Sequence, residues 1–307
     1  MTTVTPALAA DGTTARRTGF VLVGDDGTRY SRGAVDLAAD EAARRRLPLS
    51  VVTIRRSVMV PGATLSEQMR EERTAVREAE HRLRSTLARA RDRHPELTVE
   101  GSLLKDPAPE EVTDRLTGAT LLVLGTHSAY GLPAFALDSP SMELAGAVGC
   151  PVLCVPDDTG VPKGRPGAQP APVVVGVDTG VFATGLLRQA GEEAGRRATG
   201  LVVVHAYRVK PGEDPARVHA CARAAVQDLV LRAALDPRVD VTIELTSASA
   251  ATALVEWSRD ASLLVTGSRG RLALAGLTSG SVSRALLDSA VCPVLVVLEP
   301  VRQPVRL

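Results

Sequence analysis

The chain has 307 residues, which exceeds a typical single domain and suits two domains of roughly 130 to 150 residues each. Lys and Arg number 36 against 35 Asp and Glu, so no global field attracts nucleic acid or an anionic membrane. Aromatic residues make up 2% of the chain, too few for the stacking surfaces of single-strand binders, and no apolar run approaches the roughly 20 residues that span a bilayer.

The chain begins with a Thr- and Ala-rich segment, residues 1–17, which we expect to be a disordered tail. The apolar run 20–23 that follows Arg16 and Arg17 is ended by Asp25, too early for an export signal. We therefore expect a cytoplasmic protein. The cysteines lack CxxC spacing, so we expect no disulfide framework and no metal site. All four are predicted to be small buried apolar residues: Cys150, Cys154, Cys221 and Cys292.

Strand-like and helix-like patterns alternate along the first half, residues 18–156. The strand Phe20–Asp26 (FVLVGDD) opens it, and the long charged helix Ser66–Arg93 ends before Pro95. The predicted elements between and after these are a helix at Ala34–Leu47, strands at Leu49–Ile54 and Thr98–Leu104, a helix at Pro109–Leu116, a strand at Thr120–Gly125 and a last strand within Cys150–Val155. The mostly aliphatic strands are typical of a sheet that is covered on both faces.

The same elements recur in the same order in the second half, residues 172–300, after a Pro- and Gly-rich linker at residues 157–171. They are predicted at Val173–Asp178, Leu186–Ala198, Leu201–Tyr207, Pro215–Leu235, Asp240–Leu245, Ala250–Ser258, Ser262–Gly267, Val282–Asp288 and Cys292–Val297. The repeat predicts two tandem doubly wound parallel five-stranded sheets with helices on both faces, an α/β fold.

Arginines gather at the ends of two equivalent helices, at Arg44–Arg46 and at Arg196–Arg197. Cations are favourable at the negative end of a helix dipole. We expect these side chains to be solvated, and a polyanion site there is the less favoured alternative.

A glycine-rich segment follows the strand that ends at Gly267. Its pattern is Gly267-x2-Gly270, nine residues, and then Gly280-Ser281 at the start of a helix. Glycines at a strand end let backbone N–H groups approach phosphate oxygens, and a helix N-terminus offers further donors and a partial positive charge. The pattern therefore predicts a phosphate-binding loop, with a tight turn between strand and helix as the alternative.

Two further residues follow strands at the same predicted end of the sheet. The carboxylate of Asp178 and the backbone of Ala206 could hold an adenine or ribose edge by hydrogen bonds, because open α/β sheets bind ligands beyond the carboxyl ends of their strands. The alternative for Asp178 is a turn or helix-cap residue.

This pattern, within a duplicated chain, resembles the universal stress protein family in its tandem-domain form, over about residues 17–298. The resemblance implies an adenine-nucleotide α-hydrolase-like fold and an adenine nucleotide as ligand: ATP, with AMP or a cyclic nucleotide as alternatives and Mg2+ accompanying ATP. The residues it implies as contacts are Asp178, Ala206, Gly267, Gly270, Gly280, Ser281, Val282 and Ser283.

The loop of the first half departs from the pattern. It reads Gly125-Thr-His-Ser128, then nine residues, then Asp138-Ser139, so that two glycines are replaced. A side chain is costly where the backbone angles favour glycine, and a carboxylate repels phosphate. We expect this half to bind nucleotide weakly or not at all.

These features predict a stress-response regulatory protein that binds ATP in its C-terminal domain. The sequence places no convincing base, nucleophile or metal cluster beside the loop, so we expect slow hydrolysis at most. The alternatives are a nucleotidyl transferase or ligase of the same structural class, and a scaffold that binds no nucleotide. The resemblance also implies pairing through the last strands, Val152–Val155 and Val294–Leu298, within the chain and in a homodimer.

Overall fold

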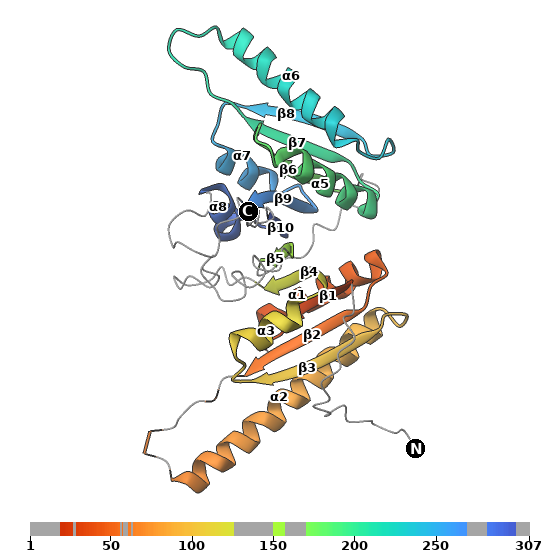
Figure 1. Cartoon of the computed structure of the whole chain (residues 1–307), viewed down its shortest axis with the longest axis vertical. Helices are drawn as coiled ribbons and strands as arrows, with labels where there is room; N and C mark the ends of the chain where they lie inside the picture. The colour runs from red at the N-terminus through yellow and green to blue at the C-terminus, as the bar shows by residue number, and fades with distance from the viewer. Residues whose placement is uncertain are drawn as a thin grey trace, which may run out of the picture.

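The computed structural model describes residues 19–26, 29–55, 57, 61–62, 64–125, 150–156, 170–268 and 281–298. Its strands form one ten-stranded sheet in the order β3-β2-β1-β4-β5-β10-β9-β6-β7-β8 (Figure 1). The first half contributes β1 (Phe20–Gly24), α1 (Arg29–Arg45), β2 (Leu49–Arg55), α2 (Leu65–Arg93), β3 (Val99–Lys105), α3 (Pro109–Leu116), β4 (Ala119–Gly125) and β5 (Val152–Val155).

The second half repeats the same order of elements. It contributes β6 (Val173–Gly176), α5 (Ala183–Arg197), β7 (Leu201–Ala206), α6 (Pro215–Ala233), β8 (Val241–Thr246), α7 (Ala250–Trp257), β9 (Leu263–Ser268), α8 (Ser281–Ser289) and β10 (Val294–Leu298). All strand pairs within each half are parallel, and each half has the strand order of a doubly wound sheet. The predicted fold class is confirmed.

Each face of the sheet carries a continuous apolar core. Helices α1, α2, α5 and α6 pack on one face, and α3, α7 and α8 pack on the other. Alternate residues of a strand point to opposite faces, so Val21 and Val23 belong to the first core while Leu22 belongs to the second. Mostly small aliphatic residues build both cores.

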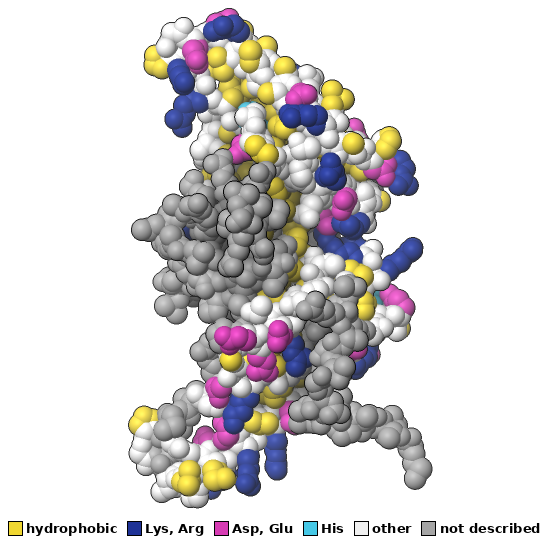
Figure 2. Space-filling model, viewed as in Figure 1, with side chains coloured by type: hydrophobic (Ala, Val, Ile, Leu, Met, Phe, Trp, Pro, Cys, Tyr) yellow, Lys and Arg dark blue, Asp and Glu magenta, His cyan; other side chains and the backbone are white. Residues whose placement is uncertain are grey.

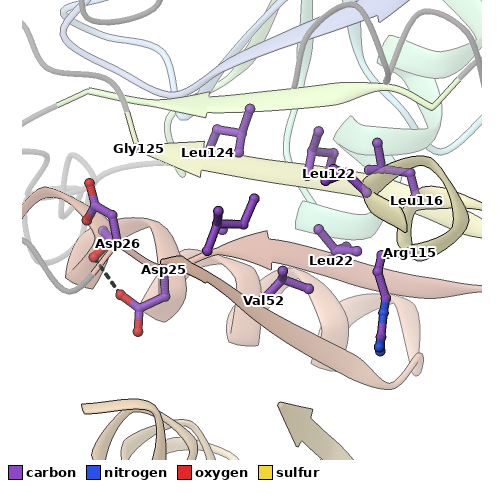
Figure 3. A pocket seen from close by; sticks show the side chains of 13 residues that line it. Leu22, Asp25, Asp26, Val52, Arg115, Leu116, Leu122, Leu124 and Gly125 are labelled. Atoms are coloured by element: carbon purple, nitrogen blue, oxygen red, sulfur yellow. Dashed lines mark hydrogen bonds between the residues drawn. The ribbon is translucent and has the colours of Figure 1, made fainter. Parts of the chain in front are cut away.

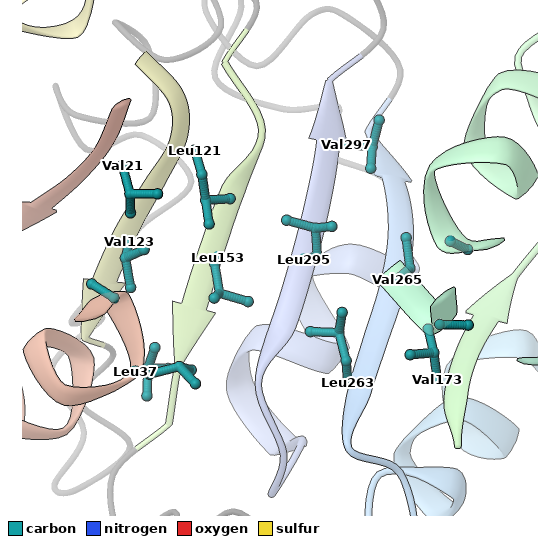
Figure 4. Close-up of a cluster of buried hydrophobic side chains, with 14 of the residues drawn as sticks. Val21, Leu37, Leu121, Val123, Leu153, Val173, Leu263, Val265, Leu295 and Val297 are labelled. Carbon is teal, nitrogen blue, oxygen red and sulfur yellow. The ribbon is translucent and has the colours of Figure 1, made fainter. Parts of the chain in front are cut away.

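The two halves join through the last strand of each, as expected. Strand β5 pairs with β10 in antiparallel fashion, with Leu153 opposite Leu295 and Val152 opposite Val296. Figure 4 shows the apolar side chains of β4, β5, β10 and β9 following one another across this junction. Two edges that would otherwise invite intermolecular pairing are thereby closed within one chain.

The arginines at the ends of α1 and α5 form a buried ionic cluster at this junction. Glu41 pairs with Arg45 on its own helix and with Arg197 across the junction, while Glu193 pairs with Arg197 and, at 2.6 Å, with Arg45. The side chains of the two glutamates are 0% and 5% exposed and those of both arginines 10%. The expectation of solvated arginines is therefore wrong for Arg45 and Arg197, because the last strands bring the two helix ends together.

Helix α2 begins with a capping box. The Thr64 hydroxyl accepts from Glu67 N at 3.3 Å, and the Glu67 carboxylate accepts from Thr64 N at 2.8 Å. Loss of such a cap costs about 1 kcal/mol, so we expect Thr64→Ala to lower the free energy of unfolding by roughly that amount, measured in urea. Thr74→Ala, at an exposed position inside the same helix, is the control and should change it little. Equal effects of the two variants would contradict the cap.

Three of the four cysteines are buried as expected, and Cys221 is exposed. The buried face of α6 contains Val226 and Leu229. Position 222 lies one helical turn before Val226 and continues this face. Cys221, one residue earlier, therefore lies off the buried face and is exposed. The prediction that all four are buried was wrong at this one position.

This difference predicts selective thiol chemistry. Burial raises the pKa of Cys150, Cys154 and Cys292 to about 12, so these thiols stay protonated at neutral pH and are shielded from reagents. We expect iodoacetamide to modify Cys221 alone in the folded protein, and all four cysteines in denaturant. Intact-protein mass spectrometry measures the number of labels, and Cys221→Ser should take up none while folded. Rapid labelling of a second thiol would contradict this burial.

Candidate functional site

The predicted site lies at the carboxyl ends of three neighbouring strands. Strand β6 pairs with β9 so that Val175 lies opposite Val265, and with β7 so that Gly176 lies opposite Val204. Two residues beyond these pairs, the same register places Asp178, which follows β6, beside Ala206 of β7. Gly267 of β9 lies on the opposite side of the same chain segment. The structure thus brings together three residues that are far apart in the sequence, at the edge where open α/β sheets bind ligands.

The carboxylate of Asp178 is exposed at this edge and also shapes the backbone. Its Oδ1 accepts a hydrogen bond from Gly180 N at 2.8 Å, which closes the turn that leads into α5. The turn-forming role considered from the sequence is therefore present. It fixes where the carboxylate sits and is compatible with a second role toward a ligand hydroxyl, since a carboxylate accepts several hydrogen bonds.

Close packing around Gly267 leaves little room for a side chain at this position. A Cβ at this position would lie 3.2 Å from the ring of Phe182 and 3.4 Å from a methyl of Leu186. The aromatic ring at the start of α5 thus lies against the strand end from which the glycine-rich segment departs. Sequence reasoning missed Phe182, because nothing in its local pattern shows that it reaches β9.

Helix α8 begins at Ser281 and is tied to the end of β9 through Ser283. The Ser283 hydroxyl is buried, donates to Gly267 O at 3.3 Å and lies 3.5 Å from Thr266 Oγ1. It therefore ties the start of α8 to the end of β9, and its contact with a ligand stays a prediction. Val282, half-buried, packs on the apolar core of that face. Gly270 and Gly280 lie outside the described residues, as does the side chain of Ser281.

Leu254 of α7 is a second residue that sequence reasoning missed. A Cβ at Gly176 would lie 2.5 Å from Leu254 Cδ1, so this leucine fills the space directly above the end of β6. Any ligand at this edge would therefore lie further out, toward Asp178 and Ala206. His205, one residue before Ala206, has its Nδ1 3.0 Å from Val177 O and acts as a packed strand residue, as expected.

The described residues include no group of three or more His, Cys, Asp and Glu side chains that could hold a metal ion. Within the same residues, no helix is long and apolar enough to cross a membrane.

Figure 2 shows Lys and Arg interspersed with Asp and Glu over the described part of the visible face, which fits the near-zero net charge. At the ends of β6, β7 and β9, the exposed carboxylate of Asp178 is a group able to accept hydrogen bonds from a ligand.

Comparisons with known proteins identify relatives of this chain and solved structures of similar fold. The profile of the universal stress protein family matches residues 20–156 and 171–297. A universal stress protein of Mycobacterium tuberculosis is 31% identical over 289 residues, covering 90% of this chain and 96% of that protein. Another, from Mycolicibacterium smegmatis, is 28% identical over 292 residues and covers 90% and 96%. The crystal structure of a universal stress protein from Archaeoglobus fulgidus has a similar fold, with a TM-score of 0.62, 15% identity and coverage of 90% and 97%.

Proposed function

The chain belongs to the universal stress protein family, and from this membership we propose that its C-terminal half binds an adenine nucleotide, with ATP as the preferred candidate. The observation that supports the proposal most directly is the strand register, which gathers Asp178, Ala206 and Gly267 where the Gly-x2-Gly-x9-Gly-Ser segment leaves β9. AMP and a cyclic nucleotide are the alternatives, because phosphate number depends on loop geometry.

Each part of the nucleotide has a candidate partner. The Asp178 carboxylate suits a ribose hydroxyl, as acidic residues after a strand do in dinucleotide sites. The backbone at Ala206 is the candidate for the base edge. Backbone N–H groups near Gly270 and at the start of α8 suit phosphate oxygens, because the first N–H groups of a helix lack partners within it. Ser281 would add a hydroxyl donor, and Mg2+ would offset phosphate charge when ATP binds.

We infer that binding serves regulation and that turnover is slow. The described residues at the site include a single carboxylate and no metal cluster, which does not favour a fast nucleotidyl transferase or ligase. Under this proposal, nucleotide occupancy changes how the protein associates with itself or with a partner. Rapid release of pyrophosphate or of an adenylated product from purified protein would favour the enzyme alternative instead.

Native mass spectrometry and calorimetric titration of the full chain test the proposal. We expect co-purified adenine nucleotide, or binding of one ATP per chain after its removal, with little product formed over hours. One site per chain is expected because the first-half loop carries Ser128 and Asp138 in place of glycine. Two equal sites would contradict this asymmetry, and absence of any adenine nucleotide binding would favour the scaffold alternative.

Two further proposals concern the oligomeric state of the protein and its cellular location. We propose a homodimer, because the family resemblance implies pairing and the junction within the chain leaves the edge strands β3 and β8 at the two ends of the sheet. Sedimentation at working concentration, with and without ATP, measures it, and a monomer under both conditions would contradict it. We also propose a cytoplasmic location.

A further inference from the structure

A cavity of about 290 Å³ lies at the junction of the two halves, beside the buried ionic cluster. It is at the amino end of β4, on the face that α1 and α5 cover. The first half's counterpart of the candidate nucleotide site, shown in Figure 3, lies at the carboxyl end of β4 and on the opposite face. The junction cavity is therefore a separate space, and both halves contribute to it.

The lining of the junction cavity is apolar on one side and polar on the other. The apolar side consists of Leu47, Leu121, Pro151 and Leu295. The polar side comes from the last turn of α1 and from the second half of α5. A ligand that matched both sides would have an apolar body and a polar group.

The charges around the cavity sum to one net positive charge within the described part of the chain. Four arginines meet three glutamates there, namely Arg44, Arg45, Arg196 and Arg197 with Glu41, Glu192 and Glu193. Asp40, another carboxylate near Arg44, is paired with Arg93 at 2.6 Å. Because the glutamates neutralise most of the positive charge, the cluster does not suit a polyanion, and the remaining charge suits a ligand with a single negative charge.

Arg44 is the arginine with donors to spare. Arg196, at the equivalent position of α5, donates to two glutamates. Among the described residues, Arg44 donates only to Glu41 Oε1, at 2.6 Å, although a guanidinium carries five N–H groups. Burial lowers the pKa of Arg44, and the charge of Arg197 lowers it further. An anion beside Arg44 would therefore be favourable.

Gln189 distinguishes the cavity from the equivalent place in the other half. Counted back from the ends of α5 and α1, Gln189 takes the place of Leu37, which is 8% exposed and belongs to the apolar core. The buried Oε1 of Gln189 has no hydrogen-bond partner in the described structure, whereas a buried amide is normally bonded to protein, water or a ligand. No described partner fixes the amide, so it can turn to donate its N–H groups to an anion in the cavity that it lines.

We propose that the junction cavity binds a small monocarboxylate with an apolar body, such as an aromatic acid. The planar guanidinium of Arg44 matches a carboxylate, which it can hold by two parallel N–H bonds, and Gln189 offers a further donor. An engineered cavity of about 150 Å³ binds benzene, so about 290 Å³ has room for one ring and its carboxylate. The proposal does not depend on nucleotide binding.

Benzoate and benzamide test the proposal on the full chain, because the two probes share one shape and differ in charge. In NMR titrations at pH 7 and low ionic strength, we expect benzoate to bind about ten-fold more tightly or better. Arg44→Gln should remove this preference by weakening benzoate binding about ten-fold, with benzamide binding unchanged. Arg46→Gln removes the same charge from an exposed side chain two residues away, and should change benzoate binding by about two-fold at most.

The methyl signals of the unsubstituted protein locate the bound probe without relying on a variant. We expect benzoate to shift the signals of Leu47, Leu121 and Leu295 and to leave those of Leu22 and Leu254 unchanged. The absence of any shift at millimolar benzoate would show that the cavity holds only water, and would overturn the proposal. Equal affinity for the two probes, equal effects of the two substitutions, or shifts centred on Leu22 or Leu254 would also overturn it. These outcomes do not bear on ATP binding, so the proposed function is tested separately.

Discussion

Replacing Glu41 by alanine is expected to lower the free energy of unfolding by about 3–5 kcal/mol, the cost of removing one partner from a buried ion pair. Glu41 is fully buried and pairs with Arg45 and with Arg197 of the other half. Its loss would leave two largely buried guanidinium groups facing only Glu193. The remaining positive charge lies where water cannot screen it, so both helix packing and the β5–β10 junction should weaken.

The matched control is Glu192→Ala, one position before Glu193 on α5. Glu192 pairs with Arg196 at 3.1 Å, but its side chain is 53% exposed. An exposed pair of this kind contributes below about 1 kcal/mol. Urea unfolding followed by circular dichroism at pH 7 compares the two variants, and Glu193→Ala should behave like Glu41→Ala. An equal, small effect of Glu41→Ala and Glu192→Ala would show that the cluster contributes little to stability.

The choice of pH follows from the titration of Glu193. Burial alone would raise the pKa of Glu193, but the nearby guanidinium groups of Arg45 and Arg197 outweigh it and the pKa is lowered from 4.5. A lowered folded-state pKa contributes stability that is fully present above the unfolded value and is lost as the pH falls through the folded value. The effect of breaking the cluster should therefore be complete at pH 7 and shrink in acid below about pH 4.5.

Gly280→Asp is expected to weaken ATP binding by about 100-fold, which corresponds to about 2.7 kcal/mol. The substitution places in the second loop the residue that the first loop has at Asp138. A carboxylate there would repel the phosphates and compete for the N–H groups at the start of α8, and any side chain restricts the backbone angles available to the loop. Calorimetric titration of the full chain measures the change in affinity.

The reciprocal substitution Asp138→Gly is the matched control and should leave the affinity of the C-terminal site unchanged. Ser281→Ala, which removes one hydroxyl donor, should cost only about three- to ten-fold, in line with about 1 kcal/mol for a single hydrogen bond. Unaltered thermal stability of all three variants would separate lost binding from lost folding. Full ATP affinity in Gly280→Asp would remove the loop from the proposed site.

The arrangement of elements was predictable because it depends on local patterns. Helix α3 was predicted at Pro109–Leu116 and found with those bounds, and the other described elements differ from prediction by a few residues at their ends. The family resemblance implied the pairing of the last strands, Val152–Val155 and Val294–Leu298, and their apolar composition agrees with it, since such strands are hazardous as bare edges. The alignment of Asp178, Ala206 and Gly267 followed from the rule that parallel strands end at one edge.

The sequence by itself determined the duplicated α/β fold, the order of its elements and the edge at which the candidate site lies, because periodicity, glycine spacing and strand composition are properties of neighbouring residues. Only the tertiary structure decided that Arg45 and Arg197 are buried with Glu41 and Glu193, and that Leu254 fills the space above Gly176. These contacts join residues that are far apart in the chain. Their existence depends on how closely two helices approach and on the length of single side chains, which no local pattern encodes.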